Sequence, residues 1–290
     1  MKILIIGNGF IASPLIDRLD QEGHKILVLS RSIKKDIKCE QIVGDIFSFD
    51  IFGLILTWAP QVIIHTAWVT TYELYKNDHI NFKFAKFTQE LAEIITKTDT
   101  KHLIVLGSCA EYGIQYSTST AGVTKLSPTN IYAKQKVVAL NLIKETLLKS
   151  NKRLSWARIF HPYGPGQDKQ RLIPYLINSI KEKKNFEVHN ITTRYDWITT
   201  RDIASAISWI ITHETPVETD IGTGIGYTNP ELLNTLEKLF GIINQRSGYD
   251  FNTLGRHEVS VADPNSPLFK TGWSPTDNLI SGIEWTSGLN

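Results

Sequence analysis

Short uncharged runs of mostly β-branched residues recur along the first part of the chain, and segments with helical spacing separate them. The runs cover residues 3–6, 26–29, 62–64 and 103–106. Strands with this composition are buried on both faces, as in parallel sheets. Between the last two runs, residues 84–95 carry apolar side chains at the three-to-four spacing of one helix face. The alternation predicts an α/β fold with a doubly wound parallel sheet and helices on both faces.

A glycine-rich turn, Gly-Asn-Gly-Phe-Ile-Ala at residues 7–12, directly follows the first run. Without a Cβ at Gly7 and Gly9, the chain can turn tightly and a pyrophosphate can approach the backbone, where free N–H groups of a helix start bind it. The pattern alone is weak, and a merely structural turn is the alternative. Its place as the first strand-to-helix turn favours a dinucleotide site that also includes Phe10 and Ile11.

The end of the second run bears on which dinucleotide binds. NAD-selective sites usually carry an acidic residue here for the ribose 2′-hydroxyl, whereas NADP sites need positive charge for the 2′-phosphate. This chain has Arg31 and Ser32, followed by Lys34 and Lys35, and no carboxylate before Asp36. A guanidinium suits a phosphate by its fork geometry as well as its charge. We expect NADP(H) to be preferred, with NAD(H) possible; a solvated basic turn is the structural alternative.

Tyr132 and Lys136 are four residues apart in Tyr-Ala-Lys-Gln-Lys, so a helix would place them on one face. A phenol has a reference pKa of about 10, too high for efficient proton transfer at neutral pH, and a nearby ammonium lowers it. Ser108 follows a predicted strand. We expect Ser108, Tyr132 and Lys136 to be catalytic, although this spacing is common by chance and an ordinary surface helix is the alternative.

Charge and cysteine content limit the function classes. The 31 Lys and Arg against 29 Asp and Glu give a formal net charge of +2, which argues against nucleic-acid binding or a polybasic membrane patch. No run approaches the roughly 18 apolar residues of a membrane span, and the first run is shorter than the roughly 7–15 residues of a signal peptide. Cys39 and Cys109 are expected to be free thiols. We expect a cytoplasmic protein.

In their order along the chain, these motifs resemble the extended short-chain dehydrogenase/reductases, in particular the nucleotide-sugar epimerase/dehydratase group. The resemblance covers nearly the whole length. Besides the glycine turn and residues 128–136, it rests on these segments: Gly44-Asp45-Ile46, His65-Thr66-Ala67, Asn81, and residues 106–113, 158–167, 196–204, 262–263 and 272–275.

The resemblance implies a Rossmann-type NAD(P)-binding domain over residues 1–160 with a returning segment near 196–222. It implies a smaller substrate-binding lobe from residues 161–195 and 223–290, a metal-free site and a homodimer. It also implies further cofactor contacts at Asp45, Ile46, His65, Thr66, Ala67, Phe160 and His161.

Departures from the family pattern narrow the reaction. Related 4,6-dehydratases carry an Asp-Glu pair directly after the catalytic Ser or Thr, whereas this chain has Cys109 and Ala110, and Glu111 comes one place later. GDP-fucose synthases use a cysteine two places after their serine, but Cys109 comes one place after Ser108. Both activities are therefore disfavoured.

Two reactions remain. In the first, which we favour because of Arg31, NADPH reduces the 4-keto group of a nucleotide-linked deoxysugar. Tyr132 donates the proton, Ser108 hydrogen-bonds the same oxygen and Lys136 holds the nicotinamide ribose. In the second, a 4-epimerase with bound NAD uses the same three residues for oxidation followed by reduction on the opposite sugar face. A non-catalytic NADP-sensing protein is a third reading, which the Tyr-Lys pair disfavours.

The substrate is expected to be a nucleotide-diphosphate sugar. Ser108, Cys109, Glu111 and Tyr132 are expected to border its sugar, although Glu111 could equally lie on the rim. Arginine forks suit a diphosphate. The candidates for gripping it are Tyr163, Arg171, Arg194, Arg201 and Arg256, of which Arg171 and Arg256 lie nearest to diphosphate-contacting positions of the family; a solvated surface arginine is the alternative at each. The aromatic residues expected in the core are Trp197, Trp209 and Trp273.

Overall fold

The computed structural model describes residues 1–71, 75–241 and 257–289. In the first half, strands and helices alternate as expected. The order is β1 (Lys2–Ile6), α1 (Ala12–Gln21), β2 (Lys25–Ser30), β3 (Glu40–Val43), α2 (Ile51–Trp58), β4 (Val62–His65), α3 (Ile80–Thr96), β5 (His102–Ser108), the short 3₁₀ helix η1 (Cys109–Tyr112), α4 (Ile131–Leu148) and β6 (Arg153–Ile159).

The second half has shorter strands. The order is β7 (His161–Tyr163), α5 (Leu172–Lys181), β8 (Arg194–Tyr195), β9 (Trp197–Thr199), α6 (Thr200–Thr212), β10 (Glu218–Ile221), β11 (Tyr227–Thr228), α7 (Asn229–Phe240), β12 (Val259–Ser260), α8 (Pro267–Lys270) and α9 (Leu279–Ser287).

Within the described residues, the main sheet has seven parallel strands in the order β10-β6-β5-β4-β1-β2-β3. From β1 the chain first runs to β2 and β3, and then crosses to β4 on the other side. Ligands of doubly wound sheets bind beyond the carboxyl ends of the strands at such a reversal. The predicted doubly wound α/β fold is confirmed.

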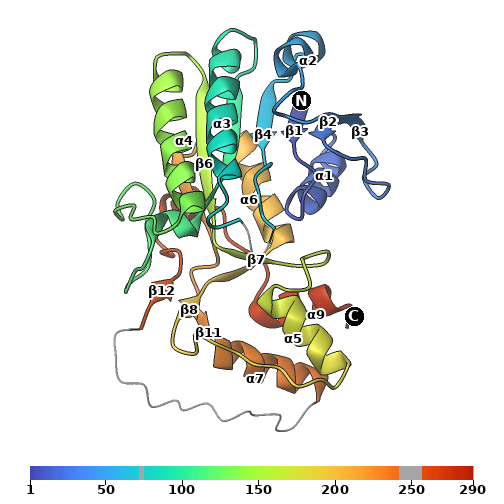
Figure 1. The fold of residues 1–290 in the computed structure, drawn as a ribbon, viewed down its shortest axis with the longest axis vertical. Coiled ribbons are helices and arrows are strands. Elements are labelled where there is room, and N and C mark those ends of the chain that lie inside the picture. The colour runs from blue at the N-terminus through green and yellow to red at the C-terminus, as the bar shows by residue number, and fades with distance from the viewer. Residues whose placement is uncertain (72–74, 242–256, 290) are drawn as a thin grey trace.

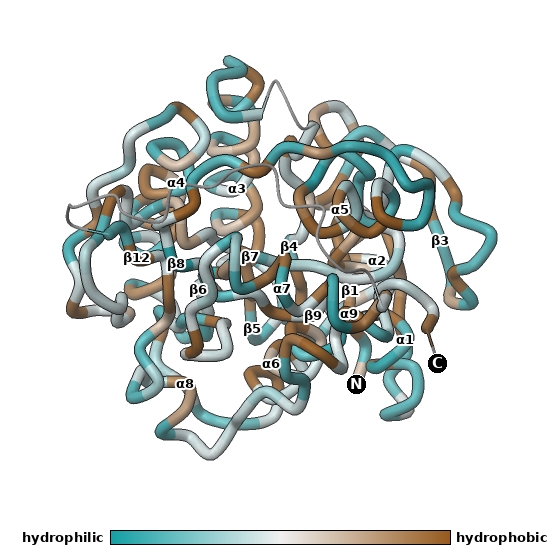
Figure 2. Tube along the Cα trace, turned by 90° about the horizontal axis from the view of Figure 1, so that it is seen from below, coloured by the Kyte–Doolittle hydropathy of each residue, from teal (hydrophilic) through white to brown (hydrophobic). Residues whose placement is uncertain are grey.

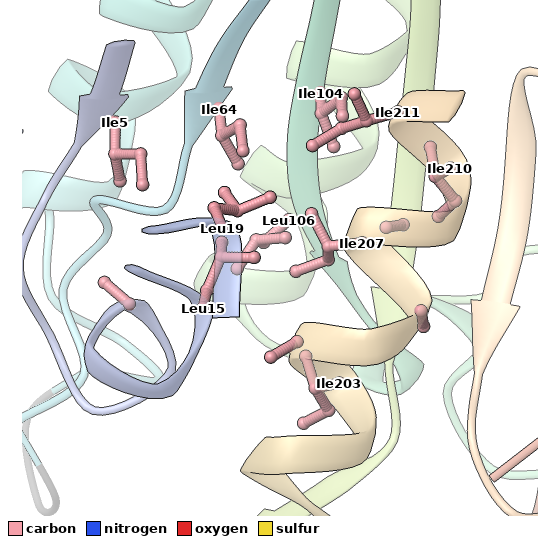
Figure 3. Close-up of a cluster of buried hydrophobic side chains, with 14 of the residues drawn as sticks. Ile5, Leu15, Leu19, Ile64, Ile104, Leu106, Ile203, Ile207, Ile210 and Ile211 are labelled. Atoms are coloured by element: carbon pink, nitrogen blue, oxygen red, sulfur yellow. The ribbon is translucent and has the colours of Figure 1, made fainter. Parts of the chain in front are cut away.

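Helices cover both faces of the sheet because successive strand residues point to opposite sides. Ile5 of β1, Leu15 of α1 and Ile207 of α6 belong to one buried cluster, which Figure 3 shows. The neighbouring Leu4 packs in a second cluster with residues of α3 and α4, such as Leu91. A strand that packs against an apolar layer on each face therefore has hydrophobic residues at consecutive positions of the sequence.

A second lobe lies beyond the carboxyl ends of the strands, below the sheet in Figure 1. Its core is formed by α5, α7 and α9, through residues such as Leu176, Leu236 and Ile283. Two small sheets, β11-β8-β12 and β7-β9, belong to the chain after β6, and β10 returns to the edge of the main sheet. Figure 2 shows hydrophobic stretches along helices such as α5 and α6, and a hydrophilic loop next to β3.

Candidate active site

A cleft of about 1750 Å³ is lined by residues of both the sheet and the second lobe. The sheet side contributes the glycine turn and the segments that follow β2, β4 and β5, together with the first turns of α4. The lobe side contributes His161 and Pro162 of β7, the start of α5 and residues 185–187, 189 and 190. The cleft therefore extends from the reversal of strand order to the second lobe.

The glycine turn has the geometry of a pyrophosphate cradle. Gly7 has a φ of +106°, and a Cβ there would lie 2.7 Å from Thr66 Oγ1. A Cβ on Gly9 would meet no atom within 4 Å, on a residue that lines the cleft. No described side chain caps the start of α1; the N–H groups of Ala12 and Ser13 donate instead to the Gly9 carbonyl oxygen, at 3.1 and 3.4 Å. Because a side chain at Gly9 would fill this space, the turn fits the phosphates of a dinucleotide.

The loop after β2 lies at the same end of the cleft. Arg31 and Ser32 line it together with Asp45 and Ile46. The Asn8 amide donates to the Ser32 carbonyl oxygen at 2.7 Å, which ties this loop to the glycine turn. The structure thus brings the sequence-derived candidates for the adenosine side together at one end.

The three candidate catalytic residues meet in the middle of the cleft. Ser108 is the last residue of β5, and Tyr132 and Lys136 lie on the first turns of α4. Asn130 caps this helix by accepting from the Ala133 N–H at 2.9 Å. The Ser108 hydroxyl oxygen accepts from the Ala110 N–H at 3.2 Å, and the hydroxyl also contacts the Tyr132 phenol.

The pKa of Tyr132 differs from our expectation. Burial raises the pKa of this phenol above its usual range, and a polar contact with the Ser108 hydroxyl only partly lowers it. The Lys136 Nζ lies 5.7 Å from the Tyr132 ring centroid. The structure therefore does not give the acidification by Lys136 that the sequence predicts, because desolvation of the phenolate dominates and the group that lowers the pKa of Tyr132 is the Ser108 hydroxyl.

Lys136 is held on its other sides. Its ammonium donates to the Leu106 carbonyl oxygen and lies 3.8 Å from the centroid of the Trp68 ring. Burial lowers the pKa of Lys136 to about 7, against the opposing influence of Glu111. The proton of this lysine is thus balanced near neutral pH, whereas an exposed lysine stays charged.

Glu111 does not face the sugar side. Its side chain is fully buried and does not line the cleft. The carboxylate accepts from the Arg158 Nε at 2.7 Å, from the Trp156 indole at 3.0 Å and from the backbone N–H of Ser108 at 2.8 Å. In place of the expected substrate contact, Glu111 forms a buried ion pair with Arg158 behind the end of β5.

Two other expected contacts also lie behind the cleft surface. His65 is buried, its Nε2 lies 3.1 Å from the Thr88 hydroxyl, and burial lowers its pKa to about 3, so its ring is neutral; its neighbours Thr66 and Ala67 line the cleft instead. Tyr163 is buried in the core of the second lobe. A tyrosine in this core packs against helices and does not reach a diphosphate.

Phe160 and His161 line the cleft, and His161 contacts the Cys109 thiol. The His161 Nε2 lies 3.8 Å from Cys109 Sγ and 2.8 Å from the Ser260 hydroxyl. Burial lowers the pKa of His161 to about 4 and raises that of Cys109 to about 12. His161 and Cys109 are therefore both uncharged. Trp197, which we expected in the core, also lines the cleft.

The candidate arginines separate in space. Arg171 lines the cleft, donates to the Thr70 carbonyl oxygen at 3.1 Å and lies 5.0 Å from the Tyr75 ring centroid. Arg194 and Arg201 do not line it and pair with acidic residues of α7 and of the segment before α9. Arg256 lies outside the described residues. Of the expected diphosphate ligands, the structure places Arg171 at the cleft.

Sequence reasoning missed three residues that shape the site: Trp68, Tyr75 and Arg158. The Tyr75 ring lies 5.1 Å from that of Tyr132, and Trp68 lies against Lys136. Arg158 had a signal, because a charged residue inside an apolar strand requires a buried carboxylate. For Trp68 and Tyr75 the sequence contains no such signal apart from their position after β4.

None of the helices formed by residues 1–71, 75–241 and 257–289 combines the length and apolarity needed to cross a membrane. In the same part of the chain, no three His, Cys, Asp or Glu side chains gather in a way that would hold a metal ion.

Known proteins match this chain over most of its length. The model of the NAD dependent epimerase/dehydratase family matches residues 3–222. The UDP-glucose 4-epimerase of Lactobacillus helveticus is 22% identical over 98% of this chain and 94% of its own. The dTDP-L-rhamnose 4-epimerase of Burkholderia thailandensis is 23% identical over 97% and 93%. The solved UDP-glucose 4-epimerase of Thermus thermophilus in complex with NAD superposes with a TM-score of 0.85 at 19% identity, covering 99% and 98%. With the glycine cradle and the Ser-Tyr-Lys cleft in place, the extent of the family match shows that this protein belongs to the NAD-dependent epimerase/dehydratase family.

Proposed function

We propose that the protein is a nucleotide-sugar 4-epimerase that uses a bound nicotinamide dinucleotide. The observation that carries the proposal is the meeting of Ser108, Tyr132 and Lys136 in one cleft that continues from the glycine cradle to the second lobe. Three relatives with nearly full-length coverage are named as 4-epimerases, which supports epimerisation over the reduction favoured by the sequence alone.

The dinucleotide would be held by the turn at Gly7 and Gly9, by Arg31 and Asp45 at one end, and by Lys136 at the other. When bound, it supplies the acceptance and return of hydride at the sugar carbon. The chain's own part is proton transfer and positioning. Tyr132 takes the proton from the C4 hydroxyl during oxidation and returns it during reduction.

Ser108 stabilises the charge that develops on the same oxygen. Its hydroxyl oxygen accepts from the Ala110 N–H, so its proton serves as a donor to oxygen atoms in the cleft, which include the Tyr132 phenol and would include the substrate oxygen. The raised pKa of Tyr132 keeps the phenol protonated, which suits the reductive half. In the oxidative half, the charged form of Lys136 and the Ser108 hydroxyl are the groups that favour the phenolate.

Reduction of a 4-keto sugar nucleotide is the second candidate, favoured by one observation. Arg31 lines the cleft where an NAD-selective site usually has an acidic residue. A guanidinium there favours NADP(H), which supports net reduction. We accordingly propose NADP(H) as the cofactor if the reaction is reductive, and NAD(H) if it is epimerisation.

We further propose a homodimer through α3 and α4. These helices pack against each other and expose Phe82 and Val138 at 49% and 42% of their surface. Analytical ultracentrifugation tests this directly, since a sedimentation coefficient of a 32.8 kDa monomer at micromolar concentration contradicts the dimer.

One assay separates the two reactions. UDP- and dTDP-linked hexoses and their 4-keto-6-deoxy derivatives are incubated with the enzyme and either cofactor. Product stereochemistry is followed by proton NMR, and cofactor oxidation by absorbance. Inversion at C4 without net cofactor consumption supports epimerisation. Stoichiometric NADPH oxidation with a 4-keto substrate supports reduction. Binding of cofactor without turnover of any substrate, unchanged in Tyr132→Phe, contradicts both.

A further inference from the structure

The end of β5 is held from two sides by groups that belong to different parts of the site. The Leu106 carbonyl oxygen accepts from the Lys136 ammonium, and two residues later the Ser108 N–H donates to Glu111 at 2.8 Å. Gly107 lies between them, and a Cβ there would come within 2.3 Å of the Trp156 indole nitrogen and 2.8 Å of Glu111 Oε1. Three consecutive residues thus connect the catalytic lysine to a buried carboxylate.

The hydrogen-bond partners of Glu111 favour its ionised carboxylate. Its oxygens accept from the Ser108 N–H, the Trp156 indole and the Arg158 guanidinium, and all three are donors. A protonated carboxyl would need an acceptor, and these partners offer none. Burial raises the pKa of Glu111, while Arg158 and the Ser108 N–H oppose that rise. We conclude that the negative charge is present, because removing it would leave the buried guanidinium with fewer partners.

We propose that Glu111 is a positioning residue for the catalytic pair Ser108 and Lys136. By holding the Ser108 N–H and placing a fixed negative charge behind the strand end, it sets where the serine hydroxyl lies and keeps the lysine as an ammonium. Glu111 does not line the cleft, so it cannot contact a substrate bound there. It therefore acts only through Ser108 and Lys136. The inference rests on the proposed function in one respect, namely that Lys136 takes part in catalysis.

The charges around Lys136 favour this role for Glu111. From β4, His65 faces the lysine, but its pKa of about 3 leaves it neutral. From α4 itself, Tyr132 is protonated at neutral pH. From β6, the positive charge of Arg158 is paired with the carboxylates of Glu111 and Glu218. Glu111 is the group that raises the pKa of Lys136 against burial.

Glu218 offers a matched control. It is the other carboxylate of Arg158, with an oxygen 2.8 Å from Arg158 Nη2, and it also binds Lys144 at 2.8 Å. Removing the charge of either carboxylate breaks one of the two ion pairs that Arg158 forms. Only the loss of Glu111 takes away the charge that supports Lys136.

The experiment compares Glu111→Gln with Glu218→Gln in the full-length protein. Glutamine keeps the size and an acceptor oxygen but removes the charge. The titration of Lys136 is followed by NMR of ¹³C-labelled lysine, assigned with Lys136→Met, so that the result does not depend on turnover. The pH profile of kcat is measured in parallel. We expect Glu111→Gln to move the lysine titration and the alkaline limb of kcat downward by about one pH unit.

We expect Glu218→Gln to lose stability while leaving the lysine titration where it is. If Glu111→Gln leaves the titration in place, or if both variants shift it equally, the positioning role is wrong and Glu111 is only structural. A shifted titration in an enzyme that turns over no sugar nucleotide upholds Glu111 and contradicts the proposed function. Should Glu111→Gln not fold, Glu111→Asp retains the charge. It is then expected to keep the wild-type titration and to lower kcat, and a downward shift with Asp refutes the proposal.

Discussion

The Nζ atom of Lys136 lies 3.8 Å from the centroid of the Trp68 ring. Trp68 is fixed by its indole N–H, which donates to Asn81 at 2.7 Å, and by stacking on Phe84 at 5.4 Å between centroids. The π face therefore offers the buried ammonium a partial negative charge in a place where water is excluded. The lysine of the site is thus stabilised by an aromatic ring from a different part of the chain.

Replacing Trp68 by Leu is expected to weaken the charged form of Lys136. A desolvated cation–π contact is worth about 1–2 kcal/mol, so the pKa of Lys136 should fall by roughly one unit. The kcat at pH 7.5 should then fall by several-fold. Trp68→Phe, which keeps a π face, is the control. Equal pH profiles for the Leu and Phe variants would mean that the ring acts by packing alone.

Removing the phenolic hydroxyl with Tyr132→Phe is expected to lower kcat by about 10²- to 10⁴-fold, the range of general acid–base catalysis. Ser108→Ala should lower it less, since the tyrosine remains. Cofactor affinity, measured by fluorescence titration, should stay within a few-fold of wild type in both variants. A Tyr132→Phe enzyme with wild-type kcat would show that the proton moves elsewhere.

Lys136 should make stability depend on pH with a definite sign. Its folded pKa of about 7 lies well below that of the unfolded chain, so the charged lysine is a cost to the folded state below pH 7. Between pH 7 and about 10.4 the unfolded chain binds the proton that the folded state has released, so the cost shrinks as pH rises.

Lys136→Met removes this cost and also the hydrogen bond to Leu106. The variant should exceed the wild type in unfolding free energy by roughly 2–4 kcal/mol at pH 6, and this excess should disappear towards pH 10. Urea unfolding at a series of pH values measures the difference. An excess that stays constant with pH would place the pKa of Lys136 outside this window.

The two glycines of the turn should respond differently to alanine. Gly7→Ala forces a side chain into a φ of +106° and against Thr66, and it should cost about 1–3 kcal/mol of unfolding free energy. Gly9→Ala meets no atom within 4 Å and should leave the melting temperature nearly unchanged. It should nevertheless weaken dinucleotide binding about tenfold or more, because the methyl group enters the cradle. If Gly9→Ala binds the dinucleotide as tightly as the wild type, the phosphates do not bind at this turn.

Arg31 should decide between the two dinucleotides. Arg31→Asp is expected to reduce NADP(H) affinity about tenfold or more while leaving NAD(H) affinity the same or better, because the 2′-phosphate loses its charge partner. Isothermal titration with both cofactors, at low and high salt, measures this. Lys35→Asp, a neighbouring change of equal charge, is the control. The assignment fails if both substitutions reduce NADP(H) affinity equally.

The sequence by itself determined the doubly wound fold, the glycine cradle and the placement of Tyr132 and Lys136 on one helix face. These are local properties. Strands buried on both faces require continuous apolar runs, a helix repeats every 3.6 residues, and a missing Cβ is read directly from a glycine. For the same reason the loop with Arg31 was placed correctly at the cleft.

Only the tertiary structure decided the electrostatics of the site. Glu111 and Arg158 are 47 residues apart, and Trp68 and Lys136 come from the segment after β4 and from α4, so no local pattern pairs them. The direction of the Tyr132 pKa depends on how completely water is excluded, which the Tyr-Lys spacing does not encode. Desolvation is a property of the assembled interior, and it overrides the charge that the helix alone would predict.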